Sequence, residues 1–240
     1  MMQVTTKAIV LSSLKYGDTS LIVKAFTASD GLKSYLLKGV LASKKGKLKV
    51  AYFMPLMQLE ITAVHKNKGT LESIREVKVL NAYSSLHTHI VKNGLVLFLS
   101  EMLSSSIQEE EKDAALYQYL ENALNWLDVH ENIANFHLLF LLNLSRFLGF
   151  YPDRENQDAP FFDLLEGCFV VAPSLNPLIE KENLNYFKQL LGINFDALDG
   201  IKMAKMHRES LLKSIILYFE LHLQGFRKPK SLAVLNAVFQ

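Results

Sequence analysis

The chain has 240 residues, of which half are hydrophobic and about a fifth are charged, so its composition is that of a folded globular protein rather than a disordered or fibrous one. A single cysteine, Cys168, excludes an intrachain disulfide and a four-cysteine zinc site. The net charge of +2 is unevenly distributed, because residues 1–80 carry 13 Lys and Arg against 5 Asp and Glu, a net +8, and the remainder carries a net −6. The basic first third is therefore the part expected to meet a polyanion.

Residues 1–80 have the pattern of half-buried β-strands. Met57, Leu59 and Ile61 alternate with polar residues, and we expect strands at 7–13, 19–27, 32–40, 53–65 and 70–79. Most of the joints between them carry Gly, Asn or Asp in the manner of tight turns. The longest joint, between the third and fourth strands, is rich in lysine. Five short strands with one long connection predict a five-stranded OB-fold barrel over residues 1–80.

Residues 81–240 have helical periodicity, with apolar residues three and four positions apart. We expect helices at 85–105, 114–128, 133–148, 181–191 and 203–224. The segment 151–173 interrupts them with a predicted β-hairpin that turns near residues 166–167. The predicted fold class is therefore α+β, an N-terminal OB-fold barrel followed by an all-α C-terminal domain with a small hairpin insertion.

No segment has the pattern of a membrane span or an export signal. The longest apolar stretch, residues 136–150, contains Asn143 and Arg146 and is shorter than the roughly 20 residues that a spanning helix needs. The N-terminus lacks a basic region followed by an apolar one. We therefore expect a cytoplasmic protein.

Residues 7–40, KAIVLSSLKYGDTSLIVKAFTASDGLKSYLLKGV, resemble the opening of the RecO family of bacterial recombination mediators. In that family a first strand leads into a GDTS-type turn, a strand ending in FT, an acidic-Gly turn, and a strand ending in KG before a basic loop. The matching positions here are 16–20, 26–27, 30–31 and 38–39. FLGFYPD at 147–153 and RKPKSLAVL at 227–235 resemble later family segments. Many relatives carry two cysteine pairs after the central helix, so the lone Cys168 indicates a zinc-free variant.

The resemblance implies a DNA repair protein that is not an enzyme and needs no cofactor. Such a mediator binds single-stranded and double-stranded DNA and anneals complementary strands. It acts with the ring-forming partner RecR to help the recombinase RecA load on coated strands. It also contacts the acidic C-terminal tail of single-strand-binding protein, and its place would be at the nucleoid.

The candidate DNA-binding residues are cations and tyrosines of the segment 1–80. Lysine suits a sequence-independent grip on phosphates because it acts as a mobile point charge, and tyrosine can stack on bases. A lysine run can equally be a solvated loop that confers only solubility, and Phe26 and Phe53 are expected in the core. The candidates are Lys15, Lys33, Lys38, Lys44, Lys45, Lys47, Lys49, Lys66, Lys68, Arg75, Tyr16 and Tyr35.

The candidate partner-binding residues lie in the helical part. An acidic protein tail needs an apolar notch flanked by cations, and Lys202, Lys205 and Arg208 share a helix face by their spacing of three, with Arg146 as a further candidate. An ordinary helix surface with lysines is the alternative. His87 and His89 are two apart, so on a helix they do not share a face and we predict no metal site.

Two other function classes stay open from the sequence. One is a protein-interaction adaptor, in which the barrel docks a protein and DNA binding is incidental. The other is a metal-dependent hydrolase acting on nucleic acid or another phosphoester. The hydrolase is disfavoured because the segment 1–80 contains only five carboxylates and no metal-binding motif.

Overall fold

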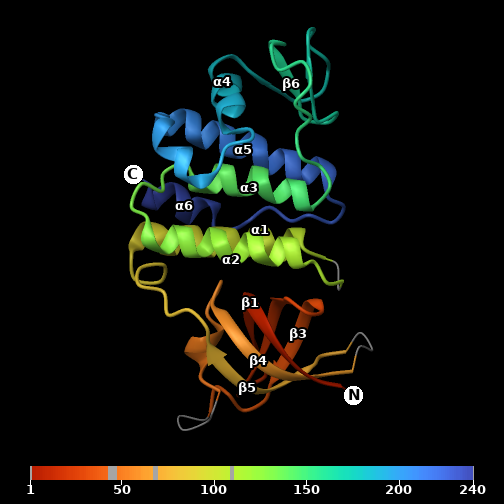
Figure 1. The fold of residues 1–240 in the computed structure, drawn as a ribbon, viewed down its shortest axis with the longest axis vertical. Helices are drawn as coiled ribbons and strands as arrows, with labels where there is room; N and C mark the ends of the chain where they lie inside the picture. The colour runs from red at the N-terminus through yellow and green to blue at the C-terminus, as the bar shows by residue number, and fades with distance from the viewer. Residues whose placement is uncertain (1, 43–47, 67–69, 109–110, 240) are drawn as a thin grey trace. The chain divides into compact units, whose positions relative to one another are not determined.

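The computed structural model of the chain describes residues 2–42, 48–66, 70–108 and 111–239. It contains two compact units, residues 1–128 and 129–240, each of which is described here by itself (Figure 1). The predicted boundary at residue 80 marks the change from strands to helices. The first compact unit also includes the two helices that follow the strands.

The first unit is built on a five-stranded antiparallel sheet in the order β3-β2-β1-β4-β5. Its strands are β1 (Met2–Tyr16), β2 (Ser20–Thr27), β3 (Gly31–Leu37), β4 (Gln58–His65) and β5 (Ser73–Val79). The edge strand β3 meets the residue before β5 in one parallel bridge, where Leu36 N donates to Glu72 O (2.9 Å) and Glu72 N donates to Ser34 O (2.8 Å). The bridge is isolated, so a closed barrel stays a prediction.

The fourth strand is shorter than the sequence predicts. A 3-10 helix, η1 (Val50–Phe53), precedes it, and β4 begins only at Gln58, so the predicted strand 53–65 is wrong in its first part. Leu56 follows Pro55 and has a φ of 60°, which turns the backbone away from an extended path. Phe53 is nevertheless in the core of the sheet and Phe26 is buried, as expected.

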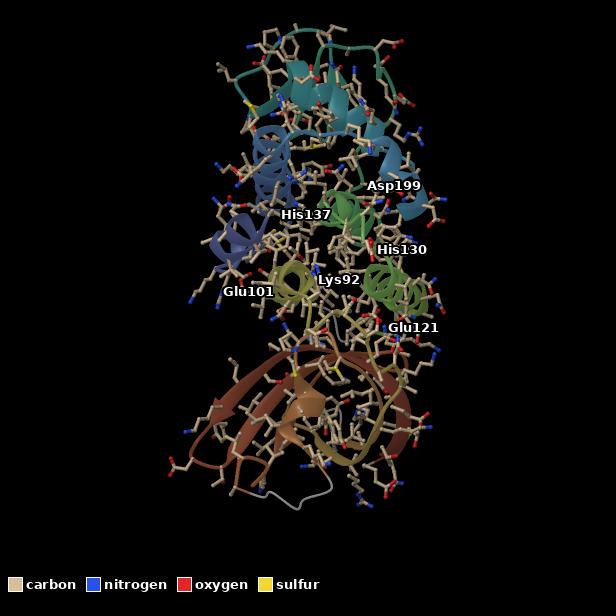
Figure 2. The ribbon with its side chains drawn as sticks, turned by 90° about the vertical axis from the view of Figure 1, so that its left-hand side faces the viewer. Lys92, Glu101, Glu121, His130, His137 and Asp199 are labelled. Carbon is tan, nitrogen blue, oxygen red and sulfur yellow. The ribbon has the colours of Figure 1, made fainter. Side chains whose placement is uncertain are left out.

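Two helices, α1 (Ile90–Ser106) and α2 (Ala114–Val129), complete the first unit by bonding to the strands. Lys24 Nζ donates to the carbonyl of Ser104 at 2.8 Å, and Lys7 pairs with Glu121 at 2.9 Å. Figure 2 labels Glu121 on α2. These polar contacts, together with the packing of α1 on β1, explain why the unit extends to residue 128.

A buried carboxylate holds the connection between the sheet and α1. Asp128 accepts hydrogen bonds from the backbone amides of Ser84 (2.9 Å), Ser85 (2.8 Å) and Leu86 (3.0 Å). Burial alone would raise the pKa of Asp128, but these amides and the Ser84 hydroxyl outweigh it and lower the pKa to about 2. Lys92, labelled in Figure 2, donates from Nζ to the Asp128 carbonyl at 2.7 Å.

The second unit combines helices with a small sheet. α3 packs against α5, and the three-stranded sheet has the order β7-β6-β8, which confirms a hairpin (β6–β7) where the sequence predicts one. The sequence did not predict β8, η2 or α6. The elements are α3 (Phe136–Phe147), β6 (Phe161–Asp163), β7 (Cys168–Val170), β8 (Leu178–Glu180), α4 (Lys181–Leu190), η2 (Phe195–Gly200), α5 (Lys205–His222) and α6 (Leu232–Val238).

The small sheet is organised by Asp163, whose carboxylate is buried. It accepts hydrogen bonds from the amides of Leu165 (2.9 Å) and Glu166 (3.1 Å), from the Ser174 hydroxyl (2.6 Å) and from the Asn176 side chain (3.0 Å). Burial opposes the charge, yet these donors outweigh it and lower the pKa of Asp163. The carboxylate therefore fixes both the β6–β7 turn and the β7–β8 connection.

Candidate nucleic-acid interface

Four candidates gather at the end of the sheet where the β1–β2 hairpin turns. Lys15 and Tyr16 end β1, and the segment after β3 is bonded to the same turn, with Gly39 N near Ser20 Oγ (3.4 Å) and Leu41 N donating to Thr19 O (2.9 Å). These bonds bring the exposed Lys38 beside the hairpin. The Ser13 hydroxyl donates to the Phe53 carbonyl, which places η1 and its preceding Lys49 at the same end. We call Lys15, Tyr16, Lys38 and Lys49 the hairpin-end surface.

The two candidate tyrosines have opposite environments. Tyr16 is 55% exposed, whereas Tyr35 is 0% exposed and belongs to the core. The Tyr35 hydroxyl is 2.9 Å from His65 Nε2, and burial, with Asp30 and Glu72 nearby, raises its pKa. The prediction that Tyr35 stacks on a base does not fit this position, because its ring faces the interior and its hydroxyl is satisfied by His65.

Three further cations lie away from the hairpin-end surface. Lys33 is buried on β3, which removes it from an exposed path. Lys66 follows β4, and its amide donates to both Glu72 carboxylate oxygens at 2.9 Å. Arg75 donates to Gln3 near the start of β1 (3.2 Å). Because Gln3 and Lys15 lie at opposite ends of β1, up to about 40 Å apart along an extended strand, Lys66 and Arg75 form a separate group.

Lys44, Lys45, Lys47 and Lys68 lie outside the described residues. The described residues on either side of the segment 43–47 belong to the neighbourhood of the hairpin-end surface, since Leu41 is bonded to Thr19 and Lys49 begins η1.

An apolar row beside this surface was missed by the sequence reasoning. Leu14 on β1 is opposite Ile22 on β2, which is opposite Leu36 on β3, and Leu14 is 65% exposed. The three side chains lie on the face opposite the core residues Val23 and Tyr35, because successive residues of a strand alternate in direction. Extending the alternation of β1 as far as Leu14 could have revealed the row.

In the second unit, α3, α5 and α6 enclose a small pocket that we call the notch. Figure 2 labels His137, the α3 residue that lines it. Arg208 lies over the ring of Phe239, with 5.5 Å from the guanidinium carbon to the ring centroid, and Nη1 donates to the Met203 carbonyl at 3.3 Å. The lining residues are His137, Lys205, Arg208, Glu209, Leu212, Leu235, Asn236 and Phe239.

The structure brings together only two of the four partner-binding candidates. Lys205 and Arg208 line the notch, while Lys202 is exposed outside it. Arg146 is in the last turn of α3, about 13 Å along the helix from His137. Burial, with help from Arg208, lowers the pKa of His137 to about 3, so this histidine is neutral near pH 7.

The described ranges contain no group of three His, Cys, Asp or Glu side chains placed to hold a metal ion. His89 Nδ1 instead lies 3.5 Å from the amide of Lys92 and caps α1. Within the same ranges, no helix combines the length and apolar character needed to cross a bilayer.

The chain is similar to RecO proteins along almost its whole length. The family model described as Recombination protein O N terminal matches residues 1–83, and the one described as Recombination protein O C terminal matches residues 87–233. The DNA repair protein RecO of Christiangramia forsetii is 52% identical over 238 residues, covering 99% of this chain and 100% of that protein. The DNA repair proteins RecO of Flavobacterium psychrophilum (51%; 99% and 100% covered) and Bacteroides fragilis (37%; 98% and 98%) are also similar.

RecO proteins are DNA repair mediators and not a family of catalysts. The resemblance over residues 7–40 is thereby confirmed at the level of the family. The chain belongs to the RecO family and has a role in DNA repair and recombination.

Proposed function

We propose that the chain acts as a recombination mediator that holds single-stranded and double-stranded DNA on the hairpin-end surface without covalent chemistry. The observation that carries the proposal is that Lys15, Tyr16 and Lys38 lie together at one end of the sheet. They belong to the segment 1–80, which has a net charge of +8. Lysines neutralise phosphates of any sequence, and an exposed tyrosine gives a base a stacking surface.

The proposal extends to the architecture of the first unit, to strand annealing and to loading of the recombinase. We propose that the first unit works as an OB-type barrel, with the hydrogen bonds between Glu72 and the edge strand β3 as support for closure. Holding two strands through their phosphates lowers their mutual repulsion and so promotes annealing. The same grip on a coated strand would expose it for loading of the recombinase RecA.

The proposed partners are RecR and the acidic C-terminal tail of single-strand-binding protein. The notch suits the tail, because Leu212, Leu235 and Phe239 offer an apolar lining and Arg208 a fixed cation for a carboxylate. A contact with RecR, a functional link to RecA and a location in the cytoplasm at the nucleoid belong to the same proposal.

The test is a quadruple variant, Lys44, Lys45, Lys47 and Lys49→Gln, measured for binding to a labelled oligo(dT) strand at several salt concentrations. Because single-strand binding loses about 0.7 in the salt slope for each phosphate contact removed, we expect the slope to fall by about 3 if all four lysines contact phosphates. Annealing of coated complementary strands should slow in parallel.

The matched control changes four exposed lysines elsewhere, Lys112, Lys181, Lys213 and Lys228→Gln, which alters the net charge equally. Unchanged affinity and annealing in the first variant would show that the lysines at 44–49 do not hold DNA, and the same result for Lys15, Lys38 and Lys49→Gln would show that the hairpin-end surface is wrong. A wild-type protein that binds partner proteins but has no measurable DNA affinity at about 0.1 M salt would instead be an adaptor.

A further inference from the structure

Two arginines of the second unit are fixed on one small platform at the end of α3. Arg146 lies over Tyr151, with 4.4 Å from its guanidinium carbon to the ring centroid. The Tyr151 hydroxyl accepts a hydrogen bond from the amide of Gly192, at 3.0 Å, just after α4. The ring of Tyr151 therefore links the end of α3 to the end of α4 and positions the first guanidinium.

The second guanidinium belongs to Arg154 and rests on Gly192. A Cβ atom at Gly192 would lie only 2.6 Å from Arg154 Nη1, and Gly192 has a φ of +81°. The backbone conformation favours glycine there, and the Arg154 guanidinium fills the space that a Cβ atom would occupy. Since Gly192 also bonds to Tyr151, both arginines belong to one cluster, which we call the arginine platform: Arg146, Tyr151, Arg154 and Gly192.

The two guanidinium groups of the platform form no ion pair within the part of the chain that the structure describes. The ion pairs found there involve other cations. Both side chains are exposed. The neighbouring carboxylate of Asp153 instead accepts a hydrogen bond from the amide of Glu155 at 3.0 Å. Asp153 and Glu155 flank Arg154 in sequence, but neither guanidinium is held in an ion pair within the described ranges, so both can accept an anionic ligand.

The chemistry of the platform favours phosphate. A guanidinium presents a planar fork of donors that matches a phosphate in two parallel hydrogen bonds, and the packing of Arg146 on the Tyr151 ring reduces the side-chain freedom that it loses on binding. An acidic peptide would also need an apolar anchor, which the notch offers and the platform residues do not. We propose that Arg146 and Arg154 form a phosphodiester-binding site of the second unit for single-stranded DNA, an assignment that rests on the proposed function.

The experiment compares the full chain with the variant R146Q/R154Q by fluorescence anisotropy on oligo(dT) across a salt series. We expect affinity to fall three- to ten-fold and the salt slope to fall by about 1.4, two phosphate contacts at about 0.7 each. The variant R146K/R154K keeps the charge but loses the fork, so its salt slope should stay at the wild-type value while its affinity falls between the two.

The matched control is K181Q/K228Q, because Lys181 pairs with Glu180 (3.1 Å) and Lys228 with Glu220 (2.8 Å), so each lysine already has a counter-charge. An equal loss in this control would overturn the proposal, since it would reveal only the effect of net charge. Wild-type affinity in R146Q/R154Q, with thermal unfolding unchanged, would also overturn it. So would a loss confined to binding of an acidic peptide.

A titration with inorganic tripolyphosphate separates this site from the proposed function. Saturable binding by the wild type that R146Q/R154Q loses supports the anion site even if oligo(dT) does not bind, in which case the proposed function fails alone. If the Lys44–Lys49 quadruple variant loses DNA affinity and R146Q/R154Q binds both probes like the wild type, the platform fails alone.

Discussion

The two units present their cations in different ways. In the first unit the exposed candidates are mostly lysines at strand ends and turns, as at Lys15 and Lys38. In the second unit guanidinium groups lie against aromatic rings, Arg208 on Phe239 and Arg146 on Tyr151. Mobile ammonium groups suit a grip on any phosphate chain, whereas fixed forks suit discrete anionic groups. The difference indicates that the lysines of the first unit and the arginines of the second hold anions in different ways, so that mutations can test their contributions separately.

The largest expected effect tests whether DNA affinity and folding stability of the first unit depend on different residues. Asp128→Ala should lower the free energy of unfolding by about 3 kcal/mol, because three backbone amides lose a charged acceptor. DNA affinity of the folded variant should be unchanged. Urea unfolding measures the first quantity, with the exposed Asp199→Ala as control.

The same variant has a defined pH dependence. The pKa of Asp128 is lowered to about 2 in the folded chain, so its stabilisation is present above the ordinary carboxyl pKa of about 4 and disappears as the pH falls towards 2. The stability difference between wild type and Asp128→Ala should therefore shrink over that interval. A difference that stays constant through it would contradict the assigned role of the charge.

Next in size is the separation of partner binding from DNA binding. Arg208→Ala should weaken binding of the C-terminal peptide of single-strand-binding protein roughly ten-fold, about 1.4 kcal/mol, because the notch loses its fixed cation. Oligo(dT) affinity should not change. Calorimetric titration with the peptide measures this, and Lys213→Ala, exposed on α5 outside the notch, is the control. Equal losses for both ligands would show that the notch is not separate from the DNA-binding surfaces.

A smaller effect is expected for the two tyrosines of the first unit. Tyr16→Ala should weaken oligo(dT) binding by about 1 kcal/mol, the low end for loss of one stacked base, without changing stability. Tyr35→Phe should do the reverse, lowering stability by about 1 kcal/mol because His65 loses its hydroxyl partner. Anisotropy and urea unfolding on both variants measure the two effects; weaker DNA binding by Tyr35→Phe would argue against its place in the core.

The last prediction concerns His137 and is a change of slope with pH rather than a single loss of energy. Its pKa is lowered to about 3, whereas an unfolded histidine titrates near 6.5, so between these values the unfolded chain binds the additional proton and stability falls as the pH falls. The slope contributed is at most about 1.4 kcal/mol per pH unit. His137→Leu should flatten the stability profile between about pH 6 and 4, and an unaltered profile would show that another group titrates there.

Sequence pattern was sufficient where local periodicity decides the structure. The alternation through Leu59 and Ile61 gave β4, and the apolar spacing around Leu120 and Leu124 gave α2. Sequence pattern was insufficient where a residue far along the chain determines the position of a side chain. The burial of Tyr35 depends on His65, far along the chain, and the fixing of Arg154 depends on Gly192. No local pattern records either pairing.

Short elements, and surfaces formed by several elements, could not be predicted from the sequence for related reasons. α6 is too short for a helical period to stand out. Lys205 and Arg208 were predicted by their spacing, but the apolar wall of the notch comes from α6, and Arg146 was assigned to the same group although α3 carries it to the other end.

The carboxylate at the centre of the small sheet has a consequence for the conditions that this protein tolerates. A hairpin cross-linked by thiolates and a metal is lost to chelators, but one gathered by Asp163 through hydrogen bonds does not depend on a metal. Its vulnerability is acid instead, because protonation of Asp163 removes the charge that strengthens the hydrogen bonds from four donors. This part of the molecule would then keep its fold under metal starvation.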